Sequence, residues 1–184
     1  FFLQSNYFCP ANGLVLDPFC GTGTVMLEAN VSGRSAIGAD ANPLAVLIAQ
    51  VKTTYIPSEK LQRTLFSVLS RAQRSNAEAS ESTESIQRWF SPSTITQLTR
   101  LEESIGKIKS CEQRKFFLLC FSNLIKKVSF ADPSISVPVK LNPERFIKNP
   151  ERKKATEFKL QTLQCIDVYD KFEDICKLNI RRIE

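Results

Sequence analysis

The chain contains no histidine and no C-x-x-C pair, although six of its 184 residues are cysteines. Without histidine, the Ser-His and Cys-His nucleophilic mechanisms are excluded from this chain. The cysteine spacing argues against a zinc site, which needs clustered Cys or His ligands, and we predict no metal site. Cysteines on apolar helix faces are usually small core residues, so we expect free thiols and a reducing, cytoplasmic setting.

Long apolar runs are also missing from the sequence. No stretch is long enough to cross a membrane, and no signal peptide is recognisable. The chain begins with Phe1 rather than Met, so we interpret it as a piece of a longer protein. Its length suffices for one domain with a hydrophobic core. The net charge of +6 is compatible with a polyanionic partner such as nucleic acid.

The N-terminal part of the sequence has the pattern strand, glycine turn, helix, strand. Residues 14–17 predict a short strand that is buried on both faces of a parallel sheet. Gly21 and Gly23 allow a sharp turn that a ligand can approach closely, and Gly33 is expected to end the helix. The second strand ends at Asp40, about where a βαβ unit places an acid near a ribose.

The residues around the turn narrow the choice of ligand. The dinucleotide-binding fingerprint requires a glycine where this chain has Met26, and a phosphate-binding loop requires a lysine, which is absent from residues 17–24. Asp17 precedes the turn, where its charge would repel a pyrophosphate and attract an ammonium or sulfonium group. S-adenosylmethionine carries both cationic groups, so we predict it as the cofactor. A βαβ unit without a ligand is the plainer alternative.

The run Asp17-Pro-Phe-Cys-Gly-Thr-Gly-Thr24 resembles the D-P-F-x-G-x-G-T signature of the amino-group DNA methyltransferases, the family that makes N6-methyladenine or N4-methylcytosine. Residues 33–53 also look like that family, and the resemblance is specific over about residues 13–56. It implies an α/β, Rossmann-like S-adenosylmethionine methyltransferase fold with a largely helical C-terminal region. The cofactor-binding residues that it implies are Asp17, Pro18, Phe19, Cys20, Gly21, Thr22, Gly23, Thr24, Asp40, Ala41, Asn42 and Pro43.

The resemblance also implies individual roles for these residues. Asp17 would lie near the methionine amino group, and Asp40 would accept hydrogen bonds from both ribose hydroxyls. Ala41 and Pro43 would lie beside the adenine ring. Two plainer interpretations stay open: Asp40 as an acid that stabilises a helix N-terminus, and Phe19 as a core aromatic. We interpret Glu28 and Arg34 as surface or turn residues rather than ligands.

Beyond Pro57 the sequence is predicted to be almost wholly helical. Asn42-Pro43 and Ser91-Pro92 each provide an N-cap followed by a proline at the first helical position. The helix after Asn42-Pro43 is expected to bury Leu44, Val46, Leu47, Ile48 and Val51. The helix after Ser91-Pro92 is expected to carry an apolar stripe of Ile95, Leu98, Leu101, Ile105 and Ile108. Residues 116–128 are apolar nearly all round and predict a central helix, and residues 134–141 predict a short edge strand. Residues 151–183 predict one long helix. We therefore divide the chain into a cofactor-binding part, residues 1–56, and a helical region, residues 57–184.

The helical region contains a cluster of basic residues between positions 140 and 160. The cluster could contact DNA phosphates, and a solvated helix face is the equally weighted alternative. Its basic members are Lys140, Arg145, Lys148, Arg152, Lys153, Lys154 and Lys159.

The catalytic half of the resembled family is not recognisable. Its second signature is Asp, Asn or Ser followed by Pro-Pro and an aromatic residue, and the nearest string, residues 131–135, lacks the second proline and the aromatic. We therefore predict no catalytic residue here, and we interpret Asp132 as part of a turn. Two predicted strands cannot stand alone, so we expect the rest of the sheet and the catalytic signature on a missing segment or a second chain. Two alternatives remain: an RNA base methyltransferase, and a non-catalytic subunit that binds cofactor or DNA.

Overall fold

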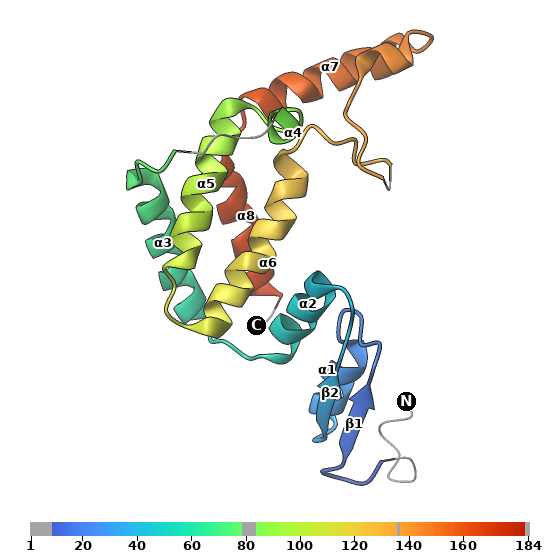
Figure 1. The fold of residues 1–184 in the computed structure, drawn as a ribbon, viewed down its shortest axis with the longest axis vertical. Coiled ribbons are helices and arrows are strands. Elements are labelled where there is room, and N and C mark those ends of the chain that lie inside the picture. Colours follow the sequence, from blue (N-terminus) through green and yellow to red (C-terminus); the bar gives the residue numbers. More distant parts are fainter. Residues whose placement is uncertain (1–8, 79–83, 136, 183–184) are drawn as a thin grey trace.

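The computed structural model describes residues 9–78, 84–135 and 137–182, and it shows a small α/β unit followed by a mostly helical region (Figure 1). In Figure 1 the α/β unit lies at one end of the molecule, and α7 projects from the bundle at the other end. The α/β unit comprises β1 (Leu14–Asp17), α1 (Thr24–Val31), β2 (Ser35–Gly38) and α2 (Pro43–Thr53). The remaining elements are α3 (Ser58–Arg74), α4 (Glu84–Gln87), α5 (Pro92–Gly106), α6 (Cys111–Val128), the 3-10 helix η2 (Pro143–Phe146), α7 (Pro150–Gln164) and α8 (Val168–Arg181).

The two strands pair in parallel, from Leu14 opposite Ser35 to Asp17 opposite Gly38. Helix α1 packs against the pair. Because side chains alternate between the two faces of a strand, one set of apolar side chains points away from α1. This set consists of Leu14, Leu16 and Ile37, which are 62%, 70% and 55% exposed. The expectation that β1 is buried on both faces is therefore wrong for the described residues, which leave this face of the sheet uncovered.

Helix α1 ends as the sequence predicts. Gly33 has φ 71°, its amide donates to the Asn30 carbonyl, and the Arg34 amide donates to the Ala29 carbonyl. This is the Schellman arrangement, in which a left-handed residue closes the helix. Arg34 is buried, so our interpretation of this side chain as a surface or turn residue is wrong. Its Nε and Nη2 both donate to the Cys9 carbonyl, at 3.1 and 2.8 Å.

The core of the molecule lies among α3, α5, α6 and α8 rather than in the α/β unit. The predicted stripe along α5 is buried, and it meets fully buried side chains from the other three helices, among them Leu61, Phe117 and Phe172. Helix α6 is less enclosed than predicted, because Leu118 and Ile125 are each 38% exposed. Helix α2 buries its alanines, Ala45 and Ala49, instead of the larger side chains that we expected on its buried side.

The C-terminal third differs most from the prediction. Two helices, α7 and α8, replace the one long helix predicted over residues 151–183, because Asp167 accepts hydrogen bonds from the amides of Tyr169 and Asp170 and so starts α8. The predicted strand at 134–141 is reduced to a single antiparallel bridge between Ala131 and Lys140, and position 136 lies outside the described residues. None of the described helices has both the length and the apolar character that a membrane crossing requires.

Candidate cofactor-binding site

Asp40 is the residue that ties the glycine turn to the end of β2. Its Oδ2 accepts the Gly21 amide at 2.9 Å, and its Oδ1 accepts the Asn42 amide at 2.8 Å. A carboxylate oxygen can accept two hydrogen bonds, so each oxygen keeps one acceptor position. The carboxylate therefore shapes the turn and can still accept two further donors, such as a pair of vicinal hydroxyls.

The missing side chain serves a different purpose at each of the two glycines of the turn. Both have left-handed φ, 49° at Gly21 and 77° at Gly23. A Cβ at Gly23 would lie 2.6 Å from the Ala49 Cβ, so Gly23 permits the close approach of α2. A Cβ at Gly21 would meet nothing within 4 Å. Of the two, Gly21 is thus the one whose missing side chain leaves space open to a ligand.

Phe19 and Asp17 lie on the open side of the turn. Phe19 is 88% exposed, which excludes the interpretation of this ring as a core aromatic. Asp17 ends β1 and its Oδ1 accepts the Phe19 amide at 3.2 Å. Both residues lie at the carboxyl end of β1, and open α/β sheets bind their ligands in the crevice outside the carboxyl ends of the strands.

Of the remaining predicted cofactor residues, Cys20 is buried and the others are exposed. Cys20 is buried, its amide donates to the Ala39 carbonyl, and its Cβ would lie 2.8 Å from a Cβ added at Gly38. Asn42 caps α2 through its side chain, which accepts the Leu44 amide. The exposed members are Pro18, Thr22, Thr24, Ala41, Asn42 and Pro43.

Lys52 is a neighbour of the turn to which we assigned no role from the sequence. Its Nζ donates to the Thr22 Oγ1 at 3.5 Å across 30 residues. The signal available was the string Val51-Lys52-Thr53, which resembles the family without indicating that the lysine reaches back to the turn. Lys52 also lines a cleft of about 700 Å³ between the α/β unit and helices α6 and α8. None of the twelve predicted cofactor residues lines this cleft, so the turn and the cleft are neighbouring but separate features.

The string nearest to the catalytic signature, residues 131–135, forms a turn. Asp132 Oδ1 accepts both the Ser134 amide, at 3.0 Å, and the Ser134 hydroxyl, at 2.6 Å. These hydrogen bonds, with Lys159 and Arg145 further away, hold the pKa of the Asp132 carboxyl below its usual value. Its acceptor capacity thus supports the local backbone, as expected for an Asx turn.

The side chains of the basic cluster between positions 140 and 160 have different neighbours. Lys153 forms an ion pair with Glu144 at 2.8 Å, and Lys140 lies over the ring of Phe130. Lys159 lines a cleft of about 390 Å³ together with Lys126 and Lys127 of α6. The sequence did not bring these two lysines into the cluster, because they precede Lys159 by more than thirty residues.

Metal-binding geometry is not found among the described residues, where no group of three or more His, Cys, Asp or Glu side chains could hold an ion. All six cysteines are free. Cys9, Cys20, Cys120 and Cys176 are buried, as expected of small core residues, whereas Cys111 and Cys165 are exposed.

The N-terminal segment is similar to a family of known proteins. Residues 6–51 match the model described as DNA methylase, which covers the turn, Asp40 and α2 up to Val51. The chain is also 27% identical, over 122 residues, to the Type II methyltransferase M.MvaI of Kocuria varians, and 34% identical, over 58 residues, to the Type II methyltransferase M.MjaII of Methanocaldococcus jannaschii. No solved structure matches the chain.

These matches include only part of each relative. The M.MvaI match includes 61% of this chain but 27% of the relative, and the M.MjaII match includes 32% of this chain and 11% of the relative. The chain therefore spans about a quarter or less of the length of these relatives. Because residues 1–56 are less than a third of the chain, the longer match also includes part of the helical region.

Proposed function

We propose that this chain, which carries a fragment of the amino-group DNA methyltransferase family, binds S-adenosylmethionine at the glycine turn and supplies the cofactor-binding part of a DNA methyltransferase. The observation that supports this most is the geometry of Asp40. Its carboxylate bonds to both the turn and the start of α2, and it retains one acceptor position on each oxygen.

The residues of the turn fit the charges of this cofactor. Asp17 would attract the ammonium group of the methionine end. The first turn of α1 has no side-chain cap, so its amides are suited to the cofactor carboxylate. Asp40 would accept the ribose hydroxyls, with Ala41 and Pro43 beside the adenine ring. The bound cofactor supplies an electrophilic methyl group, and the chain's own residues hold and orient it.

The proposed reaction is methyl transfer to the exocyclic amino group of adenine or cytosine in DNA. The family description, DNA methylase, favours DNA over RNA as the substrate. We place no catalytic residue in this chain, since Asp132 belongs to a turn. The amino-group acceptor would come from a further segment or a second chain, which would also cover the exposed sheet face of Leu14, Leu16 and Ile37.

The same proposal assigns residues 1–56 to cofactor binding and residues 57–184 to a helical region that contacts DNA through positions 140–160. Helix α7 suits this role because it projects from the bundle (Figure 1). Arg152 and Lys154 are solvent-exposed on its first turns, with Lys153 between them. Such a surface would bind the DNA backbone through phosphate contacts and would be sensitive to salt.

The experiment that tests the proposal is calorimetric titration of the 184-residue chain with S-adenosylmethionine. Replacing Asp40 with alanine removes the ribose acceptors and should weaken binding by about 1–3 kcal/mol, or about 5- to 150-fold. Asp40→Asn keeps the size and one carbonyl oxygen and should show an intermediate loss. Glu28→Ala, which removes an exposed acid from α1, is the matched control and should bind normally. Equal affinities for wild type and Asp40→Ala would contradict the role of Asp40.

A further inference from the structure

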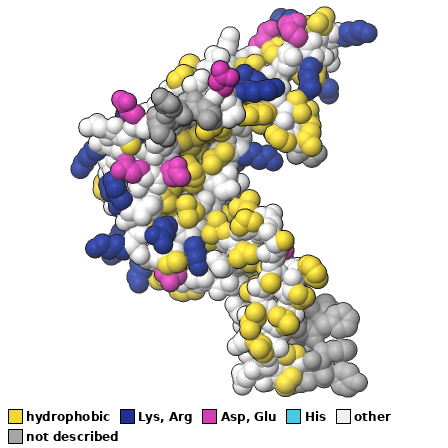
Figure 2. Space-filling view, in the orientation of Figure 1, with side chains coloured by type: hydrophobic (Ala, Val, Ile, Leu, Met, Phe, Trp, Pro, Cys, Tyr) yellow, Lys and Arg dark blue, Asp and Glu magenta, His cyan; other side chains and the backbone are white. Residues whose placement is uncertain are grey.

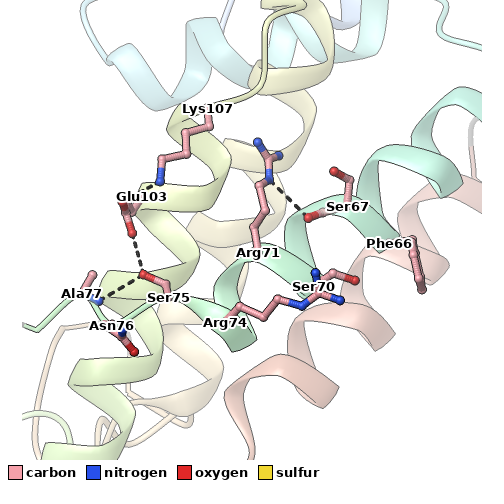
Figure 3. Close-up of a pocket in the computed structure, with 10 residues that line it drawn as sticks. All are labelled: Phe66, Ser67, Ser70, Arg71, Arg74, Ser75, Asn76, Ala77, Glu103 and Lys107. Atoms are coloured by element: carbon pink, nitrogen blue, oxygen red, sulfur yellow. Dashed lines mark hydrogen bonds and ion pairs between the residues drawn. The ribbon is translucent and has the colours of Figure 1, made fainter.

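A second surface, on the α3 side of the bundle, has the chemistry of a nucleic-acid site. It is a pocket of about 660 Å³ between α3 and α5, and Figure 3 shows the residues that line it. Among the described residues of the lining, three are cationic, Arg71, Arg74 and Lys107, and Glu103 is the one carboxylate. Hydroxyl groups of Ser67, Ser70 and Ser75 complete its polar side. This composition suits an anion with several oxygen atoms.

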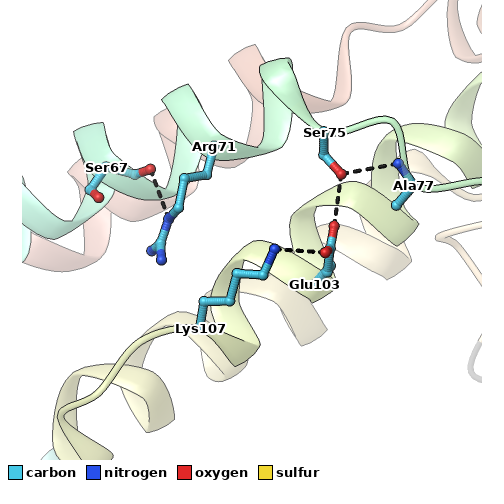
Figure 4. Close-up of polar contacts among 6 residues, drawn as sticks. All are labelled: Ser67, Arg71, Ser75, Ala77, Glu103 and Lys107. Carbon is cyan, nitrogen blue, oxygen red and sulfur yellow. Dashed lines mark hydrogen bonds and ion pairs between the residues drawn. The ribbon is translucent and has the colours of Figure 1, made fainter.

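The polar contacts in the pocket engage its carboxylate and leave arginine groups available. Glu103 accepts the Lys107 ammonium and the Ser75 hydroxyl, both at 2.7 Å (Figure 4). These two partners keep the pKa of Glu103 below its usual value, so it is ionised at neutral pH and offsets the charge of Lys107. Arg71 uses Nε for the Ser67 carbonyl, at 3.2 Å, and its terminal nitrogens reach the gap between α3 and α5 in both close-ups. The surplus positive charge of the pocket therefore comes from Arg71 and Arg74.

An exposed aromatic ring joins this pocket to a second one. Phe66 is 75% exposed, and it lines both the first pocket and a neighbouring pocket of about 370 Å³ between α3 and α8. The second pocket also contains basic side chains, Lys177 and Arg181. Lys177 is paired with Glu173 at 2.8 Å. Phe66 thus stands between arginines on both sides: Arg71 and Arg74 on one, Arg181 on the other.

We propose that this surface binds a single strand of DNA, with a base stacked on Phe66 and the flanking phosphates bound by Arg71, Arg74 and Arg181. Arginine suits the phosphates because its planar guanidinium donates two parallel hydrogen bonds. Proteins that hold single strands combine a basic groove with aromatic rings on which bases stack. The centres of protein interfaces are also enriched in arginine and aromatic residues, but they are depleted in lysine and glutamate, and both residue types line each of these two pockets. The choice of DNA as the strand rests on the proposed function, whereas the stacking and phosphate chemistry rest on this surface alone.

The test measures binding of a fluorescein-labelled ten-nucleotide oligo(dT) to the 184-residue chain by fluorescence anisotropy at low salt. Phe66→Ala should weaken binding at least about fivefold, as expected for the loss of one stacked base. Arg71→Ala combined with Arg74→Ala should weaken it further and reduce its salt dependence. The matched control removes two exposed lysines that line neither pocket, Lys60→Ala with Lys109→Ala, and should bind close to wild type. Thermal unfolding of each variant confirms that it is folded.

An abasic strand of equal length separates stacking from charge. Wild type should bind the abasic strand more weakly than oligo(dT), and Phe66→Ala should not distinguish the two strands. Undetectable binding of oligo(dT), or equal binding by wild type and Phe66→Ala, would overturn the proposal. Tighter binding of oligo(rU) than of oligo(dT) would overturn the choice of DNA. Calorimetric titration of Phe66→Ala with S-adenosylmethionine should match wild type, so failure of this proposal is distinguishable from failure of the proposed function.

Discussion

The contrast between Gly21, Gly23 and Gly33 gives a prediction that separates cofactor binding from stability. All three glycines have left-handed φ, at 49°, 77° and 71°. Alanine in that conformation costs about 1–2 kcal/mol in each case. The surroundings differ: an added methyl group meets open space at Gly21 and Gly33, but at Gly23 it collides with the backbone and side chain of Ala49. Overpacking of this kind adds about 1–3 kcal/mol.

The expected results follow from these terms. Gly21→Ala and Gly33→Ala should each lower the free energy of unfolding by about 1–2 kcal/mol, whereas Gly23→Ala should lower it by about 2–5 kcal/mol. Only Gly21→Ala should combine a small loss of stability with a large loss of cofactor affinity, because its methyl group occupies the space that we assign to S-adenosylmethionine. The affinity should fall by about 1–3 kcal/mol, the cost of one overpacked methyl group.

Two measurements check this prediction. Urea denaturation followed by circular dichroism gives the free energy of unfolding, and calorimetric titration gives the affinity. Gly33→Ala is the matched control, because it carries the same backbone strain at the opposite end of α1. The reasoning is refuted if Gly21→Ala binds the cofactor as wild type does, or if Gly33→Ala loses as much affinity as Gly21→Ala.

Two further predictions concern the DNA-contacting segment and the exposed sheet face. Replacing Arg152, Lys153 and Lys154 with glutamate should reduce retention of duplex DNA in a low-salt gel shift. Arg152 and Lys154 should contribute more than Lys153, because Lys153 is paired with Glu144. An unaltered gel shift would identify the cluster as solvated surface. Leu16→Glu should change the free energy of unfolding of this chain by no more than about 0.5 kcal/mol, because Leu16 is 70% exposed. Leu61→Ala, in the core, should lower the free energy of unfolding by about 2–5 kcal/mol. A large loss of stability for Leu16→Glu would show that the sheet face is covered.

The parts of the fold that the sequence predicted correctly depend on local chemistry. Gly33 closes α1 because only a left-handed residue satisfies the final carbonyls. Asn42-Pro43 and Ser91-Pro92 start helices because their side chains accept amides that the helix leaves free. The α5 stripe is buried because its apolar residues recur at helical spacing. The break before α8 also had a local signal, the Asp167 cap, but the apolar pattern on both sides of it suggested one continuous helix.

The features that could not be predicted depend on contacts between distant residues. Arg34 is buried because the Cys9 carbonyl, 25 residues earlier, accepts two of its nitrogens. The two faces of β1 differ because α1 covers one of them and no described residue covers the other. In the candidate site, the sequence indicated Asp40 and the glycines, but not that Gly23 serves the packing of α2 or that Lys52 reaches Thr22. The single-strand surface had a weak signal, the hydroxyl and basic residues Ser67, Ser70, Arg71 and Arg74 at helical spacing along α3.

The central claim is that the turn between β1 and α1 holds S-adenosylmethionine. Amide chemical-shift mapping of the isotope-labelled chain during titration with this cofactor tests the claim most directly, because it reports all the backbone amides, those of every residue except the prolines, at once. The largest shifts should occur at Phe19–Thr24 and at Asp40–Asn42, with saturation at a single dissociation constant. Shifts confined to the cleft between α2 and α6, or no shifts at all from a folded chain, would contradict the claim.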